Sequence, residues 1–120
     1  MYIDSGNSAI LETAEAFELS KDDSNWTFFS NYGHVYFLIA LTDDLTLREI
    51  SDRVGITERS VQGIIQSLEE AGYVQRLKVG RNNSYKIKPG KTLRHSLESD
   101  VKLEDLTQLI RKAIKARSKA

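Results

Sequence analysis

Arg59, Gln62 and Gln66 carry donor groups that match the edges of DNA bases. The guanidinium of Arg59 can donate two hydrogen bonds to guanine O6 and N7, and a glutamine carboxamide can pair with adenine N6 and N7. We expect these side chains on the outer face of a helix whose other face is apolar, where a groove of duplex DNA could receive them. The alternative is an ordinary solvated helix face.

Gly63 lies among these residues. A glycine inside a helix costs about 1 kcal/mol relative to alanine. Its place on the outward face therefore indicates that another molecule approaches the helix backbone closely. Tight packing against another helix would explain the glycine equally well.

A second set of cations falls within residues 76–88, where a basic ribbon would suit phosphates. The alternative is a solvated strand edge that lysines protect from aggregation. Arg48, together with the backbone amides that follow Thr46, could meet one further phosphate. Arg81 is also suited to a minor groove, and Lys88 ends the ribbon. The predicted contacts to the DNA backbone are Thr46, Arg48, Arg76, Lys78, Arg81, Asn82 and Lys86.

No residues have the spacing of a catalytic or metal site. The 120 residues include no cysteine, no glycine-rich phosphate loop, and two histidines, His34 and His95, that stand far apart. We therefore expect no enzyme, no metal and no cofactor. Because there is no apolar stretch of membrane-spanning length and no secretory signal, we expect a cytoplasmic protein with no membrane partner.

The net charge is zero, but the charges are unevenly distributed along the chain. Residues 1–45 carry a net charge of −7, residues 46–94 carry +5 and residues 95–120 carry +2. Since proteins bind DNA phosphates through Lys and Arg, this distribution favours residues 46–94 as a DNA-binding part.

Apolar residues at helical spacing predict one helix from about Asn31 to Leu41 and two more after it. Thr46 and Glu49 have the form of a capping box at the start of the second helix. Gly55 tolerates the positive φ at which that helix would end.

The third helix is expected to begin at the N-cap Thr57 and to end near Gly72. So short a connection forces the second and third helices to cross steeply, as in a helix-turn-helix. A β-hairpin is expected over residues 73–88. The inward stripe of the third helix consists of Val61, Ile64, Ile65 and Leu68.

The remaining segments flank this arrangement. Residues 1–25 are expected to be an acidic arm or helix, and residues 91–120 a linker followed by an amphipathic helix over about 102–116. That helix is our candidate for dimerisation, and packing against its own subunit is the competing explanation. The residues expected to form the dimer contact are Leu103, Leu106, Ile110 and Ile114.

Trp26, Phe28 and Phe29 precede the first helix. Exposed aromatics can stack single-stranded bases, but a cluster in front of a core helix more often packs. We therefore predict that these rings pack, and that His34 is a structural hydrogen-bonding residue.

The stretch from Leu47 to Gln62, followed by Leu68 to Val74, resembles the winged helix-turn-helix regulators of bacteria and archaea, most closely small ArsR- and MarR-like transcription factors. Trp26 and the run from Asn31 to Val35 belong to the same resemblance, which covers about residues 26–90. It implies a third helix in the major groove and a wing, with Arg81 at its tip, on the flanking backbone. The residues implied to face DNA are Thr57, Arg59, Ser60, Gln62, Gly63 and Gln66.

Two departures limit the resemblance. The chain lacks the cysteines of metal-sensing ArsR relatives, and it is shorter than typical MarR proteins, so we expect neither a metal sensor nor a built-in effector pocket. The sequence predicts a mainly α protein with a small β-hairpin (α+β), a winged helix-turn-helix with an extra C-terminal helix. The predicted function is that of a homodimeric, sequence-specific regulator of transcription that binds double-stranded DNA. The alternative is a winged-helix module for protein interaction or assembly without nucleic acid.

Overall fold

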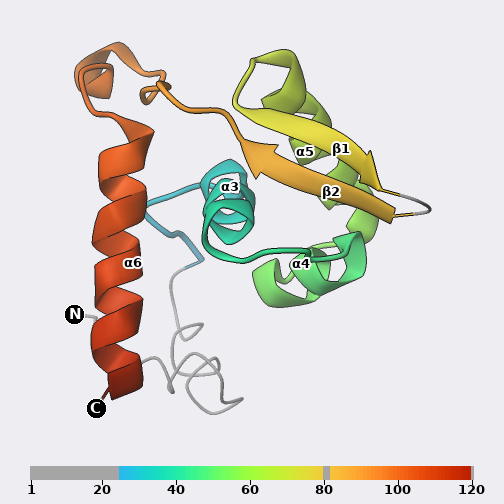
Figure 1. The fold of residues 1–120 in the computed structure, drawn as a ribbon. Helices are drawn as coiled ribbons and strands as arrows, with labels where there is room; N and C mark the ends of the chain where they lie inside the picture. Colours follow the sequence, from blue (N-terminus) through green and yellow to red (C-terminus); the bar gives the residue numbers. More distant parts are fainter. Residues whose placement is uncertain (1–24, 80–81, 120) are drawn as a thin grey trace. The chain divides into compact units, whose positions relative to one another are not determined.

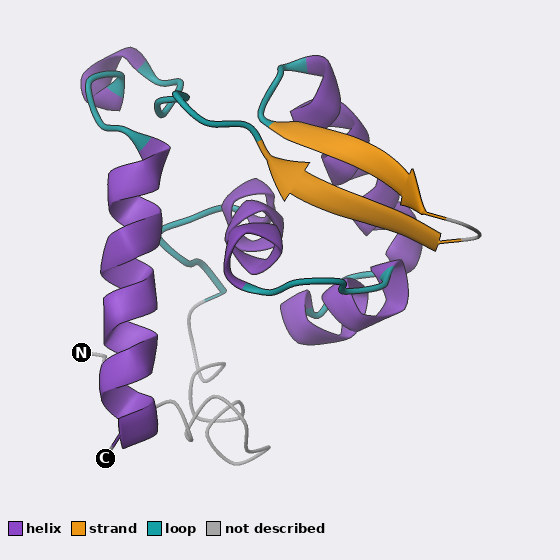
Figure 2. Ribbon diagram, viewed as in Figure 1, coloured by secondary structure: helices purple, strands orange, loops and turns teal. Residues whose placement is uncertain are grey.

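A computed structural model of the chain describes residues 25–79 and 82–119. Its order of three helices, a hairpin and a C-terminal helix confirms the predicted fold class (Figures 1 and 2). One compact unit spans Phe29–Thr107, and a second contains the described residues of Met1–Phe28 and Gln108–Ala120. The elements are α3 (Asn31–Leu41), α4 (Leu47–Val54), α5 (Glu58–Glu70), β1 (Val74–Val79), β2 (Asn82–Ile87), a short 3-10 helix (Ser96–Glu98) and α6 (Leu103–Lys119).

Helix α3 forms the middle of the first unit, where it contacts α4, α5 and β2 (Figure 1). It is buried on more than one side, because these three neighbours pack around it. Truncation of such side chains to alanine typically costs about 2–5 kcal/mol. The largest fully buried side chains of the unit are Val35, Ile50, Val61 and Ile65, which come from all three helices.

The second helix begins and ends as the sequence predicts. The Thr46 amide donates to Glu49 Oε1 at 2.9 Å, and the Glu49 amide donates to Thr46 Oγ1 at 3.1 Å, which completes the capping box. The hydrogen bond from the Thr46 amide, followed by the Thr46 hydroxyl, lowers the pKa of the Glu49 carboxyl. At the other end, Gly55 has φ +88°, and the amides of Gly55 and Ile56 both donate to the Ser51 carbonyl.

Helix α5 is held at both ends by local hydrogen bonds. Thr57 Oγ1 accepts from the Ser60 amide at 3.0 Å. At its C-terminal end Gly72 has φ +83°, and the Tyr73 amide donates to the Leu68 carbonyl at 2.8 Å. The chain therefore reverses immediately into the hairpin.

Strands β1 and β2 are antiparallel, with a register that runs from Val74 opposite Ile87 to Val79 opposite Asn82. The Lys88 amide extends this ladder by donating to the Tyr73 carbonyl at 2.9 Å. The first strand starts at Val74, within the range of residues 73–88 predicted for the hairpin.

Residues after the hairpin fold back and join the first unit. The Tyr73 hydroxyl donates to the Thr92 carbonyl at 2.8 Å, and Lys91 Nζ lies 5.0 Å from the centre of the Tyr73 ring. The Leu103 amide donates to the Lys91 carbonyl at 3.0 Å. The compact unit thus continues beyond residue 90, to Thr107.

The three aromatic residues before α3 do not behave alike. Phe29 packs edge-to-face on Phe37, with ring centres 5.4 Å apart, as predicted. Trp26 is 66% exposed and Phe28 is 91% exposed. Their rings pack edge-to-face on each other, with ring centres 5.1 Å apart. For these two residues the prediction of packing is wrong, because most of the surface of each is exposed.

His34 has the structural role that was predicted. Its Nδ1 lies 3.1 Å from the Asn31 side-chain oxygen, one helical turn earlier. Partial burial lowers the pKa of its imidazole. His95 caps the short 3-10 helix, because its Nδ1 accepts from the Leu97 amide at 3.0 Å.

Candidate nucleic-acid interface

Helix α5 separates its apolar and polar residues cleanly. Val61, Ile64 and Ile65 are buried against the core. The opposite face is exposed and carries every residue of α5 that was predicted to face DNA, namely Arg59, Ser60, Gln62, Gly63 and Gln66. Because Thr57 caps the helix directly before them, the N-terminal half of this face lies next to the α4–α5 turn.

The polar groups of this face differ in how free they are. Thr57 Oγ1 accepts from the Ser60 amide and donates to Ser60 Oγ at 2.9 Å, so both hydroxyls serve the helix cap. The Gln66 carboxamide donates to Glu70 Oε2 at 3.3 Å. The side chains of Arg59 and Gln62 have no hydrogen bond to any residue within the described ranges 25–79 and 82–119. They are therefore ready to donate to a ligand.

Gly63 occupies an open position on the same face. A Cβ built on this glycine meets no atom within 4 Å. Packing against another part of the described chain therefore does not account for the glycine. Its missing side chain leaves the helix backbone accessible from outside.

An ion pair joins the end of α5 to the first strand. Arg76 Nη2 donates to Glu69 Oε1 at 2.8 Å, and these side chains are 46% and 26% exposed. Arg76 was predicted to contact the DNA backbone, but in this structure its guanidinium is bound to a carboxylate. Glu69 was not among the predicted site residues, since a partner seven residues away across a helix end leaves no periodic signal in the sequence.

The cations of the hairpin are divided between its two faces. Directly opposed residues share a face of a two-stranded sheet, and successive residues alternate. Arg76 is opposite Tyr85 and Lys78 is opposite Asn83, whereas Lys86 is opposite Gln75 on the other face. The expectation of a single basic ribbon is therefore corrected, because the register separates Lys86 from the other two.

Two further residues predicted to contact the DNA backbone lie at the turn of the hairpin. Asn82 is the first residue of β2 and pairs with Val79. Arg81, the predicted wing tip, lies outside the described residues.

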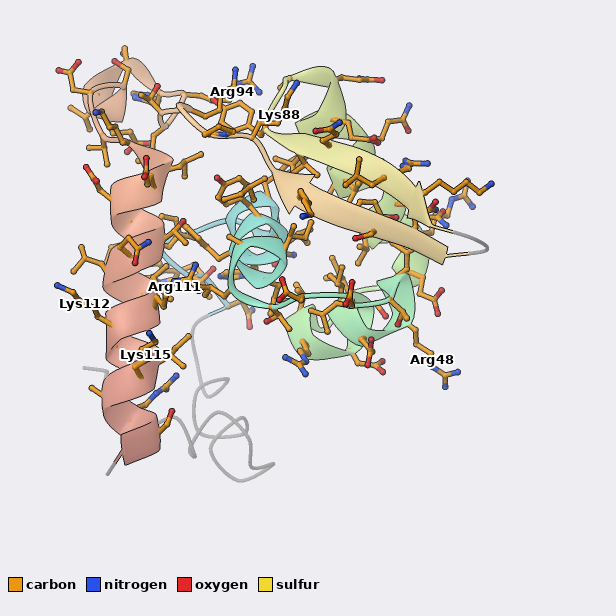
Figure 3. All side chains as sticks on the ribbon, viewed as in Figure 1. Arg48, Lys88, Arg94, Arg111, Lys112 and Lys115 are labelled. Atoms are coloured by element: carbon orange, nitrogen blue, oxygen red, sulfur yellow. The ribbon has the colours of Figure 1, made fainter. Side chains whose placement is uncertain are left out.

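At the start of α4, Arg48 is exposed and points away from the protein (Figure 3). The hydroxyl of Thr46 is used by the capping box, so of these two predicted contacts Arg48 offers the freer group. The four residues predicted for dimerisation lie on α6, where Leu103 is only 7% exposed. Burial in its own chain removes Leu103 from any surface that a second copy could reach.

Metal-binding clusters and membrane-spanning helices are both absent from the described residues. Residues 25–79 and 82–119 contain no group of three or more His, Asp or Glu side chains that could hold a metal ion. No helix in these ranges is long and apolar enough to cross a membrane.

The α4–α5 pair packed on α3, with the hairpin directly after α5, is a winged helix-turn-helix. A family model described as sugar-specific transcriptional regulator TrmB matches residues 31–91, just over half of the 120 residues. The chain belongs to this family and is a DNA-binding transcriptional regulator. The expectation of a winged-helix transcriptional regulator is therefore confirmed. The matching family model is that of TrmB, and it does not specify an ArsR- or MarR-like type. No curated protein and no solved structure gives a significant match to the chain.

Proposed function

We propose that the chain binds specific sequences of double-stranded DNA as a homodimer, with α5 in the major groove and the hairpin on the flanking backbone. The observation that carries this proposal is the face of α5, where Arg59 and Gln62, without partners in the described chain, flank an open backbone at Gly63. Arg59 suits guanine, and Gln62 suits adenine. Two such helices in a dimer would read half-sites about 34 Å apart.

The charges along α5 indicate which part of the helix approaches DNA. The first turn of α5 carries Arg59 together with one acid, Glu58, whereas its last turn carries two acids, Glu69 and Glu70, and no cation. Glu70 also continues the face of Gly63 and Gln66, since it follows them at helical spacing. Phosphates would repel these carboxylates, so the N-terminal half of α5 enters the groove and the C-terminal half points out of it.

The test is fluorescence anisotropy with a mixed duplex pool and with the protein's own upstream DNA, at two salt concentrations. We expect tight, salt-sensitive binding that Arg59→Ala weakens, with a loss of preference at one base pair. Arg94→Ala is the matched control, because it removes an exposed arginine from outside α5 and the hairpin (Figure 3). Equal losses in the two variants would assign Arg59 to general charge attraction and contradict its role in base readout.

One observation favours the alternative of a protein-interaction module. Trp26 and Phe28 expose large aromatic surfaces outside the winged helix, and exposed aromatics are enriched where proteins bind each other. If no duplex binds even at low salt, these two rings would be the first surface to substitute in a search for a protein partner.

A further inference from the structure

One side of α6 continues beyond the winged-helix unit. Leu103, Thr107, Ile110, Ile114 and Arg117 follow one another at steps of four, three, four and three residues. Such steps keep side chains in line along one side of a helix, as in a seam with a partner helix. Leu103 and Thr107 are buried and belong to the winged-helix unit, whereas the last three residues belong to the second unit. We call these three residues the α6 seam.

The α6 seam is only partly covered. Ile114 is 38% exposed, and Ile110 and Arg117 are partly buried. The Nε atom of Arg117 is buried but has no hydrogen-bond partner within residues 25–79 and 82–119. A buried N–H without an acceptor is unfavourable, and a carboxylate is the strongest partner of a guanidinium. The seam therefore suits a segment that brings apolar side chains together with an acid.

Residues 1–24 have this composition. They contain six acids and one lysine, a net charge of −5, whereas residues 108–120 contain five cations and no acid, a net charge of +5. In the same segment, Ile10, Ala14 and Phe17 recur at steps of four and three residues, like the α6 seam. We propose that residues 1–24 bind the α6 seam of their own chain, with one of their acids paired to Arg117.

The course of the chain brings the end of this segment to α6. Residues 25–28, which follow it directly, belong to the same compact unit as the end of α6. The chain enters the winged-helix unit at Phe29, while α6 leaves that unit after Thr107. A segment that leads to Phe29 along α6 therefore runs in the direction opposite to α6, and we expect an antiparallel pair.

A second copy fits the α6 seam less well. Because residues 108–120 contain no acid, two such helix ends would repel each other and neither would supply an acceptor for Arg117. The seam also continues the side of Leu103, which the chain itself covers. Leu109, which is 64% exposed, lies on a different side of α6 and stays free in this arrangement.

The pairing would limit how strongly α6 attracts DNA. Cations without neighbouring acids draw phosphates whatever the base sequence, and the acids of residues 1–24 would offset them. This consequence rests on the proposed DNA-binding function, whereas the pairing itself does not.

Disulfide cross-linking tests the pairing, because the chain contains no cysteine. Ile10→Cys or Phe17→Cys is combined with Ile110→Cys or Ile114→Cys, or with Lys112→Cys as the control on the opposite side of α6 (Figure 3). We expect disulfides to the seam to form within one chain several-fold faster than those to the control. In an antiparallel pair, Phe17→Cys should prefer Ile110→Cys, and Ile10→Cys should prefer Ile114→Cys. Rates equal to the control, or disulfides between chains, would overturn the proposal.

Hydrogen exchange on the full chain tests the pairing of Arg117. The amides of residues 10–17 should be protected in the wild type. Arg117→Ala should lower this protection several-fold, whereas Lys112→Ala, which removes a cation from the opposite side, should not. Amides of the wild type that exchange as in an unfolded chain would overturn the proposal, and equal effects of the two variants would overturn the role of Arg117.

Binding to random duplexes at low salt separates this proposal from the DNA-binding function. Ile114→Asn weakens the pairing without a change of charge and should raise the affinity several-fold. Ala116→Asn, on another side of α6, should leave the affinity unchanged. Equal affinities of the two variants would overturn the effect of the pairing on DNA. If no variant bound any duplex while the cross-links formed, only the DNA-binding function would be contradicted.

Discussion

The guanidinium of Arg76 lies 2.8 Å from the carboxylate of Glu69, so the first strand of the hairpin is fixed to the last turn of α5. Both side chains are partly exposed, and such pairs contribute about 0.2–1 kcal/mol to stability. The ion pair is therefore more important for where the hairpin stands beside α5 than for folding.

Exchanging the charges of this ion pair should show whether Arg76 positions the hairpin or contacts DNA itself. Arg76→Glu is expected to weaken duplex binding, because repulsion from Glu69 displaces the hairpin, while the melting temperature changes little. The double variant Arg76→Glu/Glu69→Arg restores the pair and should recover much of the affinity in anisotropy titrations. If Arg76 instead contacted a phosphate, the double variant would bind no better than Arg76→Glu.

Gly63→Ala should make the protein more stable and a poorer DNA ligand. Alanine removes a helix penalty of about 1 kcal/mol, and its Cβ meets nothing within 4 Å in the described chain. The same methyl group would lie between α5 and the groove. Denaturant unfolding and anisotropy measure the two effects. Gly33→Ala is the control for stability, because its Cβ would come within 3.1 Å of Phe29 Cβ, so less stabilisation is expected there.

Gln62→Ala and Gln66→Ala should differ in their effect on base preference. Gln62 has no hydrogen-bond partner in the described chain, whereas the Gln66 carboxamide is held by Glu70. We expect Gln62→Ala to relax the preference at one base pair by about 1–3 kcal/mol, the usual contribution of a bidentate contact. Gln66→Ala should change it less. Competition titrations with single-base variants of the selected site provide the comparison, and a larger loss at Gln66 would contradict it.

His34 should make stability depend on pH in the weakly acidic range. Burial lowers the pKa of the folded imidazole, so the unfolded chain binds the proton first as the pH falls. Stability is therefore unaffected by this group above its ordinary pKa of about 6.5 and decreases below it, until the folded state is protonated as well. Urea unfolding of the wild type and of His34→Gln at several pH values tests this. The difference between the two should change with pH only below neutrality.

Features set by neighbouring residues could be predicted from the sequence. The cap at Thr57, the capping box at Thr46 and the turn at Gly55 each depend on contacts within a few residues, and each is found as expected. The exposed face of α5 follows from its apolar stripe, because a helix that buries one side must expose the other.

Features set by long-range contacts could not be predicted. The division of the hairpin cations depends on strand register, and the pairing of Arg76 with Glu69 depends on how β1 leaves α5. Burial of Leu103 requires residues 91–103 to fold back, which no local pattern indicates. An apolar position on an amphipathic helix does not reveal whether the chain itself or a second copy covers it.

The open backbone at Gly63 has a genetic consequence. Most harmful substitutions lower the folded population, and cells then degrade the product. Alanine at position 63 would instead yield a protein that folds better and persists in the cell but binds DNA poorly. In the proposed homodimer, such a protein would pair with normal copies and impair their binding to DNA, so a single altered gene copy would be dominant over an intact one.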